Sequence, residues 1–224
     1  MGAHTVISIL AIFIALLVAF SIGYWKLVFI HFLCALGLWF YSTTFKRQFF
    51  IGNFIIASFT ALVPLIVGVY ELILDAKAYI PVDDTINIAL IWKWVLGISF
   101  FAFMTTLLRE IIKDIEDYEG DEEFGCQTMP IVMGIPITKG IATVFALGTM
   151  GCLGYLQTLQ YHIKDFPGLY YFAFGLQLPL AILIYMMITS RTKKAYHRAG
   201  NMAKLIMLLG VCYLSVFSYF VFHP

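Results

Sequence analysis

Acidic side chains gather in one short segment of an otherwise apolar chain. Eight of the 13 acidic residues lie between positions 110 and 123, and the basic residues Arg109 and Lys113 lie at the start of this segment. Side chains three or four positions apart are neighbours on a helix, and carboxylates at that spacing repel each other. In a helical segment one face would carry four of them: Glu110, Asp114, Asp117 and Asp121.

This stripe of carboxylates has two interpretations, a solvated helix end or a divalent-cation site. Negative charge near the C-terminus of a helix opposes the helix dipole, which weakens the first interpretation. Mg²⁺ favours one or two protein carboxylates together with water and substrate phosphate oxygens, and Arg109 and Lys113 would then face the same polyanion. The residue types and spacing alone leave both interpretations open.

The pattern around the stripe resembles a known family motif. The run Arg109-Glu110-x-x-Lys113-Asp114-x-Glu116-Asp117-x-Glu119-Gly120-Asp121 resembles the second aspartate-rich motif of the UbiA superfamily of intramembrane prenyltransferases. It looks most like the branch that includes digeranylgeranylglyceryl phosphate synthase. The continuation Gly125-x-x-Thr128-Met129-Pro130 is similar to the G-x-x-T-L-P of that family, with Met in place of Leu. An earlier stretch resembles the cytoplasmic loop of the family in which a Tyr and a Lys lie beside the diphosphate: Tyr41, Ser42, Lys46, Arg47, Gly52 and Asn53.

The resemblance implies a membrane enzyme that ionises a prenyl diphosphate, such as geranylgeranyl diphosphate, and transfers the isoprenoid group to a lipid or aromatic acceptor. Because the leaving diphosphate is highly charged, the implied catalysis is electrostatic, with Mg²⁺ as Lewis acid and template. The implied metal ligands are Asp114, Asp117 and Asp121, and the implied catalytic residues are Asp117, Asp121 and Lys113. The implied substrate-binding residues are Tyr41, Lys46, Asn53 and Arg109, with Lys113 also near the diphosphate.

The sequence departs from the family pattern in its first half. Family members carry a first motif, N-D-x-x-D-x-x-x-D, after their second helix, but this sequence contains no Asn-Asp pair. We therefore expect a chain that corresponds to the family from its third helix onward, without the first two helices and the first aspartate-rich motif. The alternative interpretation is a non-catalytic remnant, or a membrane protein that binds an isoprenoid diphosphate without turnover.

Composition independently indicates an integral membrane protein. Of 224 residues, 62% are apolar and only 12% are charged, against about 25% charged residues in soluble domains. A soluble domain of this size buries only about 70–75% of its unfolded surface, which is too little to hide so much apolar area. The four cysteines show no C-x-x-C spacing and indicate no disulfide framework or zinc site. Membrane lipids are the expected surroundings, and nothing indicates a nucleic-acid partner.

The positions of the charges predict seven transmembrane helices in a single all-α domain over residues 1–224, because a bilayer needs about 20 apolar residues per helix. The expected spans are 5–25, 27–45, 48–70, 85–108, 140–163, 166–190 and 205–224. Pro64 and Pro179 lie within spans and predict local kinks.

Basic residues predict the orientation of the bundle. The connections after the second, fourth and sixth spans contain ten Lys and Arg residues, and the opposite side contains only Lys26, Lys77, Lys93 and Lys164. The positive-inside rule then places the acidic segment and the N-terminus in the cytoplasm and the C-terminus outside. We expect the protein in the cell (inner) membrane.

A few further polar residues have alternative interpretations. Asn53, inside a span, either joins helices or contacts substrate, and His31 is expected to pack without binding a ligand. The basic stretch 191–204 is interpreted as a topology signal that contacts anionic lipid, or as a guide for a polyanionic substrate. Asp75, Asp83 and Asp84 are expected in an exposed outer loop. A transporter is disfavoured because the charges cluster at one membrane interface and not at the midplane.

Overall fold

The computed structural model describes residues 2–78 and 88–222, and every regular element in these two stretches is helical. The all-α prediction is therefore confirmed. In chain order the elements are α1 (Gly2–Ile22), the short 3-10 turn η1 (Trp25–Leu27), α2 (Val28–Thr43), the 3-10 turn η2 (Phe45–Arg47), α3 (Ile51–Ala78), α4 (Ile88–Glu116), α5 (Tyr118–Glu123), α6 (Met129–Met133), α7 (Ile135–His162), α8 (Phe166–Tyr171), the π-helical turn η3 (Phe172–Gln177), α9 (Leu178–Thr189) and α10 (Lys193–Phe222). The expected outer loop with Asp83 and Asp84 lies outside the described residues, as does the side chain of Asp75.

Five of these helical segments are long and apolar enough to cross a membrane: Trp25–Thr43, Ile51–Leu74, Ile91–Glu116, Ile135–His162 and Phe166–Thr189. They coincide with the second to sixth predicted spans. The first and seventh predicted spans fall on α1, whose apolar part is the shorter stretch Val6–Ile22, and on α10. The count of seven spans therefore remains a prediction.

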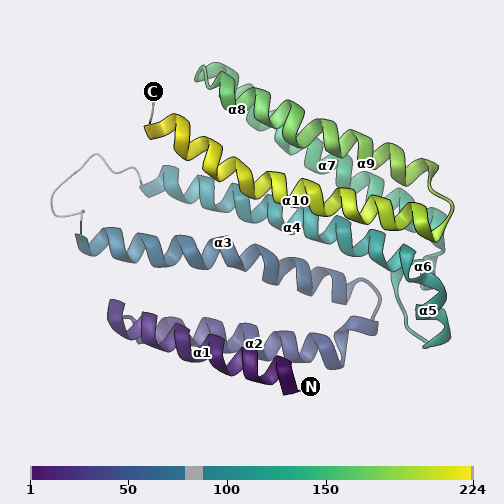
Figure 1. Ribbon diagram of the computed structural model, residues 1–224, viewed down its shortest axis with the longest axis horizontal. Helices are drawn as coiled ribbons and strands as arrows, with labels where there is room; N and C mark the ends of the chain where they lie inside the picture. Colours follow the sequence, from purple (N-terminus) through teal and green to yellow (C-terminus); the bar gives the residue numbers. More distant parts are fainter. Residues whose placement is uncertain (1, 79–87, 223–224) are drawn as a thin grey trace.

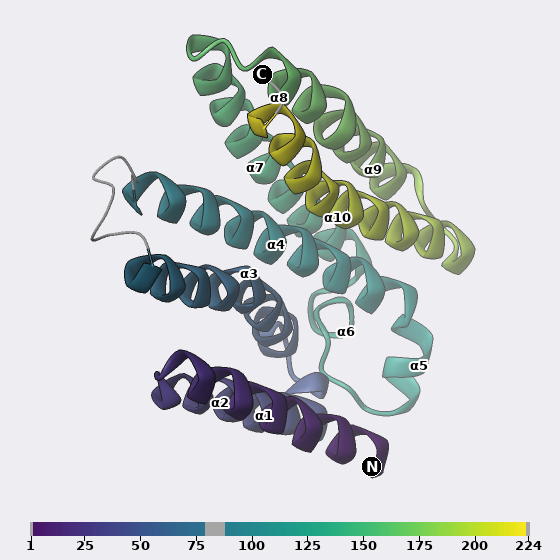
Figure 2. The same ribbon diagram turned by 60° about the vertical axis from the view of Figure 1, so that its left-hand side comes forward.

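The long helices run roughly side by side, with α4 in the middle of the bundle (Figure 1). On one side α4 packs along α3, and on the other it packs against α10 and α7, which in turn contact α9. The α1–α2 hairpin joins the edge of the bundle through α2 and α3, as the rotated view also shows (Figure 2). This order places α3 and α10, which are distant in sequence, on opposite sides of the same helix.

The apolar core is centred on the C-terminal half of α4. Leu107, Leu108, Ile111 and Ile112 are almost fully buried there, together with side chains from α9 and α10 that include Leu183. Full burial of such a side chain contributes about 1.5–3 kcal/mol. The position and rotation of α4 are therefore fixed just where its sequence changes from apolar to charged.

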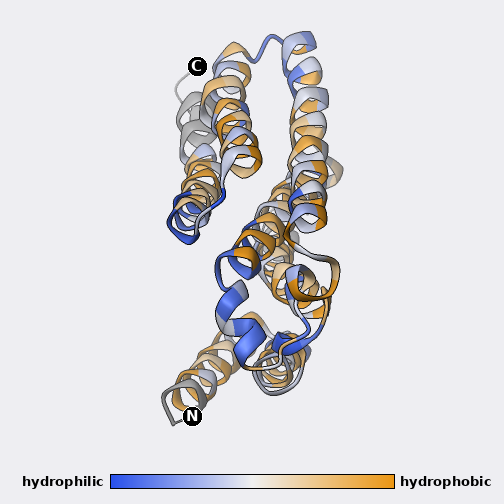
Figure 3. Cartoon of the chain, turned by 90° about the vertical axis from the view of Figure 1, so that its right-hand side faces the viewer, coloured by the Kyte–Doolittle hydropathy of each residue, from blue (hydrophilic) through white to orange (hydrophobic). Residues whose placement is uncertain are grey.

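Hydrophilic residues gather at the end of the bundle that carries α5 and the start of α10, whereas the lengths of the helices are largely hydrophobic (Figure 3). The α2–α3, α4–α7 and α9–α10 connections all lie at this end (Figure 1). This arrangement agrees with the prediction that these three connections share one side. The described residues 193–204 form the first turns of α10, so most of the expected basic loop is helical.

Lys139 joins three helices at the same end. Its Nζ atom donates hydrogen bonds to the carbonyl oxygens of Ile188 (3.1 Å) and Ser190 (2.8 Å), where α9 ends. The buried Tyr196 hydroxyl donates to the same Ser190 oxygen at 3.0 Å. Because the last carbonyls of a helix lack partners within the helix, these contacts fix the α9–α10 connection and the start of α10.

The π-helical turn η3 lies directly before Pro179. A proline within a helix lacks an N–H donor, and its ring clashes with the carbonyl group four residues earlier, here that of Gly175. A wider turn gives this carbonyl group more room. The helix that contains Pro179 thus departs from regular α-helical geometry through a π-helical turn. At Pro64, in contrast, α3 continues as one α-helix on both sides of the proline.

The Lys139 contacts predict that Lys139→Met lowers the free energy of unfolding by about 1–3 kcal/mol, because two carbonyl groups lose a charged donor. Thermal unfolding of the protein in detergent measures the change. Lys194→Met, which alters an exposed lysine on α10, is the matched control and should leave the melting temperature almost unchanged. Equal melting temperatures for the two variants would contradict the assigned role.

Candidate functional site

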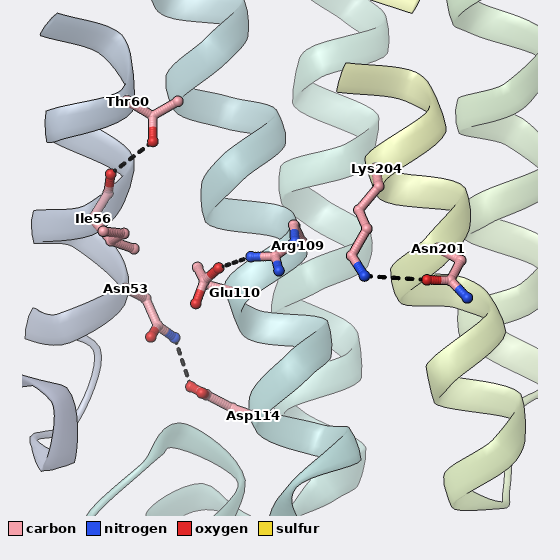
Figure 4. Close-up of polar contacts among 8 residues, drawn as sticks. All are labelled: Asn53, Ile56, Thr60, Arg109, Glu110, Asp114, Asn201 and Lys204. Carbon is pink, nitrogen blue, oxygen red and sulfur yellow. Dashed lines mark hydrogen bonds and ion pairs between the residues drawn. The ribbon is translucent and has the colours of Figure 1, made fainter. Parts of the chain in front are cut away.

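The candidate site lies where α4 leaves its apolar segment. On the side of α4 that faces α3, the Asn53 side-chain amide donates a 2.6 Å hydrogen bond to Asp114 Oδ2 (Figure 4). Asn53 is 9% exposed, and the charges of Asp121 and Glu110 also act on Asp114. Asn53, whose role the sequence left open, thus joins α3 to α4 and reaches the acidic segment in the same contact.

The α2–α3 connection approaches this side of α4. The backbone N–H of Gln127 donates a 2.9 Å hydrogen bond to the carbonyl oxygen of Arg47, so the loop after α5 is tied to η2. Burial raises the pKa of the Cys126 thiol, the nearby Asp121 carboxylate raises it further, and the charges of Arg47 and Lys46 lower it. The two segments that resemble family motifs are therefore neighbours in space.

Tyr41 and Arg109 also lie close to these acidic residues. Tyr41, near the end of α2, is partly buried, and the charges of Glu110, Asp114 and Arg109 act on its hydroxyl group. The Arg109 guanidinium group forms an ion pair with Glu110, which is 7% exposed (Figure 4). A buried carboxylate needs such a partner, because an unpaired buried charge is costly.

A pocket opens on the other side of α4, between α4 and α10. Its lining residues are Arg109, Lys113, Glu116, Asp117, His197, Gly200, Asn201 and Lys204. His197 Nδ1 lies 2.8 Å from Glu116 Oε1, and Lys204 Nζ donates to Asn201 Oδ1 at 3.2 Å. The first turns of α10 thus contribute three polar side chains to this pocket, as many as α4 does.

The predicted site residues fall into two groups around α4. Tyr41, Asn53, Asp114 and Asp121 belong to the side that faces α3, where the exposed Lys46 also lies, and we call this set the α3-side group. Lys113 and Asp117 line the α4–α10 pocket, and Arg109 takes part in both. Within the described residues no three His, Cys, Asp or Glu side chains converge closely enough to hold a metal ion by themselves.

The sequence profile of the UbiA prenyltransferase family matches residues 2–221. The chain belongs to the UbiA prenyltransferase family. The UbiA resemblance of the two motif segments is thereby confirmed, and the long apolar helices agree with a protein that is integral to a membrane.

Two curated relatives share the name digeranylgeranylglyceryl phosphate synthase. Digeranylgeranylglyceryl phosphate synthase of Methanosphaera stadtmanae is 28% identical over 178 residues, which cover 79% of this chain and 57% of the relative. The synthase of the same name from Pyrococcus horikoshii is 33% identical over 147 residues, 64% of this chain and 45% of the relative. The chain therefore spans about half the length of the curated relatives it matches. No solved structure matches it.

Sequence reasoning missed the residues that α10 supplies to the site of this UbiA chain. His197, Asn201 and Lys204 were grouped into a basic loop, although their spacing of four and three positions would place them on one face of a helix. The sequence analysis also predicted that Asp117 and Asp114 share a helical face and a metal site. Lys113 and Arg109 lie about one and two helical turns before Asp117, which directly follows Glu116, the last residue of α4.

The Asn53 contact predicts that Asn53→Leu lowers the free energy of unfolding by about 1–3 kcal/mol, because the Asp114 carboxylate loses its amide donor. Thr60→Val is the matched control on α3, since the Thr60 hydroxyl donates only to the Ile56 carbonyl of its own helix (Figure 4). Thermal unfolding in detergent compares the two variants. The contact is not important for stability if the leucine variant unfolds at the wild-type temperature.

Gly52 fixes the position of the loop that carries Lys46. A Cβ atom at Gly52 would lie 2.7 Å from the Phe45 carbonyl oxygen and 3.3 Å from the Lys46 Cα atom, both of which belong to the backbone. Gly52→Ala should therefore displace η2 and speed limited trypsin cleavage after Lys46 and Arg47 by severalfold. Gly148→Ala, where nothing lies within 4 Å of the added Cβ, should keep the wild-type cleavage rate. Identical cleavage in both variants would exclude the proposed close approach.

Proposed function

We propose that this protein is a Mg²⁺-dependent membrane prenyltransferase that transfers an isoprenoid group from a prenyl diphosphate, such as geranylgeranyl diphosphate, to a lipid or aromatic acceptor. In the proposed reaction the allylic C–O bond breaks and its electron pair leaves with the diphosphate. The acceptor then bonds to the allylic carbon and loses a proton. The observation that carries the proposal is the contact between the two motif segments, through Asn53 with Asp114 and through Gln127 with Arg47.

The α3-side group is the proposed site for the donor diphosphate. Lys46 is exposed beside the acidic segment and supplies a positive charge, and the Tyr41 hydroxyl supplies a hydrogen-bond donor. Donors that are already oriented stabilise the charge that develops on the leaving group without reorganising during the reaction. Arg109, which lies near Tyr41 and also lines the pocket, is placed to act on either side of α4.

The donor set in this group fits a magnesium ion that is shared with the substrate. Asp114 and Asp121 are close enough for their charges to interact, and two carboxylates with water and phosphate oxygens form a common magnesium environment. In this proposal Asp114 and Asp121 would hold the ion. Asp117 and Lys113, which line the pocket on the other side of α4, keep the catalytic role that the resemblance implies. Bound Mg²⁺ would supply Lewis-acid stabilisation of the leaving diphosphate.

In this proposal residues 1–224 form part of a UbiA-like transmembrane domain, with seven membrane spans, in the cell (inner) membrane. The α2–α3, α4–α7 and α9–α10 connections would face the cytoplasm. The support for this orientation is the common location of these connections at the hydrophilic end of the bundle (Figures 1 and 3). The diphosphate would remain in the aqueous interface, while the isoprenoid chain lies among apolar helices.

The proposal predicts that membranes containing the protein transfer label from geranylgeranyl diphosphate to geranylgeranylglyceryl phosphate, an acceptor chosen from the names of the relatives, and that EDTA abolishes the transfer. Asp114→Asn and Asp121→Asn should each lower the rate by about 100-fold or more, because each removes a proposed metal ligand. Glu119→Gln, an exposed change in the same acidic segment, is the control and should retain activity.

Each outcome of this assay separates the proposal from its alternative. Binding of geranylgeranyl diphosphate without any transfer would favour the non-catalytic protein. Equal losses in Asp121→Asn and Glu119→Gln would remove the proposed distinction between these carboxylates. Transfer that persists in EDTA would exclude the magnesium role.

A further inference from the structure

Basic residues are concentrated at the connection between α9 and α10, at the hydrophilic end of the bundle (Figure 3). Arg191, Lys193, Lys194 and Arg198 lie within eight positions, and no Asp or Glu follows Asp165 in the sequence. All four basic side chains are exposed, and within the described residues none of them forms an ion pair. We call these four residues the α10 basic patch.

The acidic side chains that face α10 are already engaged or lie on another side of the helix. Of the elements that pack against α10, only α4 contains Asp or Glu. Its Glu116 is paired with His197, and its other carboxylates are held by the ion pair and the amide contact described above. Asp117 lines the α4–α10 pocket, which neither Lys194 nor Arg198 lines. The positive charge of the patch therefore has no compensating carboxylate beside it in the described part of the chain.

Contacts beneath the patch hold it in place. Arg191 lies close enough to Lys139 for their charges to interact, and Lys139 Nζ lies 5.7 Å from the centroid of the Tyr196 ring. Thr192 caps α10, because its hydroxyl group accepts a 3.3 Å hydrogen bond from the Ala195 N–H. The positive end of the α10 dipole therefore lies within the patch and adds to its charge.

The face of α10 that carries the patch continues into an apolar surface. Lys194, Arg198, Leu205 and Leu208 share one helical face by their spacing, and both leucines are exposed, at 45% and 58%. Seven residues of α-helix separate Arg198 from Leu205 by about 10 Å. The head-group region of one leaflet is about 5–7 Å thick. With Leu205 at the edge of the hydrocarbon core, the long side chain of Arg198 reaches the lipid phosphates.

We propose that the α10 basic patch binds the head groups of anionic phospholipids of the surrounding membrane. Exposed Lys and Arg side chains at this depth attract an anionic leaflet, whereas a zwitterionic lipid offers no net charge. The shared face with Leu205 and Leu208 favours lipid over a guide for a polyanionic substrate, because this face does not include the pocket-lining side chains of α10. The lipid site does not depend on the proposed transfer reaction, since none of the four residues belongs to the site of that reaction.

The test is direct binding of a short-chain lipid. Dioctanoyl phosphatidylglycerol is titrated into the purified full chain in nonionic detergent, and calorimetry gives the dissociation constant. The double variant Lys194→Gln/Arg198→Gln should raise this constant roughly tenfold or more, because about 1 kcal/mol for each charge corresponds to about fivefold. Dioctanoyl phosphatidylcholine should bind the wild type and the variant equally weakly.

The matched control is Lys26→Gln/Lys164→Gln, which removes two exposed lysines from the opposite end of the bundle and changes the net charge by the same amount. This variant should bind phosphatidylglycerol as the wild type does. Added salt should weaken the binding of phosphatidylglycerol to the wild type and have little effect on the Lys194/Arg198 variant, because exposed charges are screened.

Four results would overturn the proposal. The Lys194/Arg198 variant could bind phosphatidylglycerol normally, the control variant could lose as much affinity, or salt could leave binding to the wild type unchanged. The fourth is displacement of phosphatidylglycerol from the wild type by inorganic diphosphate, which would assign the patch to a polyanionic substrate.

Discussion

The arrangement of the site depends on a partly buried carboxylate, that of Asp114, at the boundary between apolar and charged turns of one helix. Removing a carboxylate from water is costly unless it is hydrogen-bonded, and here the amide of Asn53 supplies the bond at 2.6 Å. That requirement sets the rotation of α3 relative to α4. It also brings the beginning of α3, and the loop before it, to the acidic segment, where the backbone contact between Gln127 and Arg47 holds them.

The helix α4 then separates two electrostatic environments. Its buried residues, such as Ile111 and Ile112, prevent rotation because they pack in the core. Polar side chains in successive turns must therefore point either to α3 or to α10. One side gathers carboxylates near a tyrosine and a lysine, and the other combines two lysines and an arginine with two carboxylates and a histidine.

The sequence predicted the parts of this arrangement that depend on local patterns. Apolar length predicted the helices, and the spacing of Glu110 and Asp114 predicted that they share a face. Other parts depend on packing between distant segments. The partner of Asn53 lies 61 positions away, so no local pattern could identify it. The spacing of His197, Asn201 and Lys204 could have indicated a helical face, but which helix that face meets is decided by tertiary packing.

The π-helical turn before Pro179 has a consequence for sequence change in the helix that contains it. Such a turn holds one residue more than an α-helical turn, and each residue rotates an α-helix by about 100°. Phe172, at the start of the turn, and Leu180, after it, are both buried. A regular α-helix would separate the directions of two residues eight positions apart by about 80°, and the extra residue removes this difference. Deleting one residue between positions 172 and 177 would turn one of these two faces toward the lipid, so this short interval should tolerate substitution far better than a change in length.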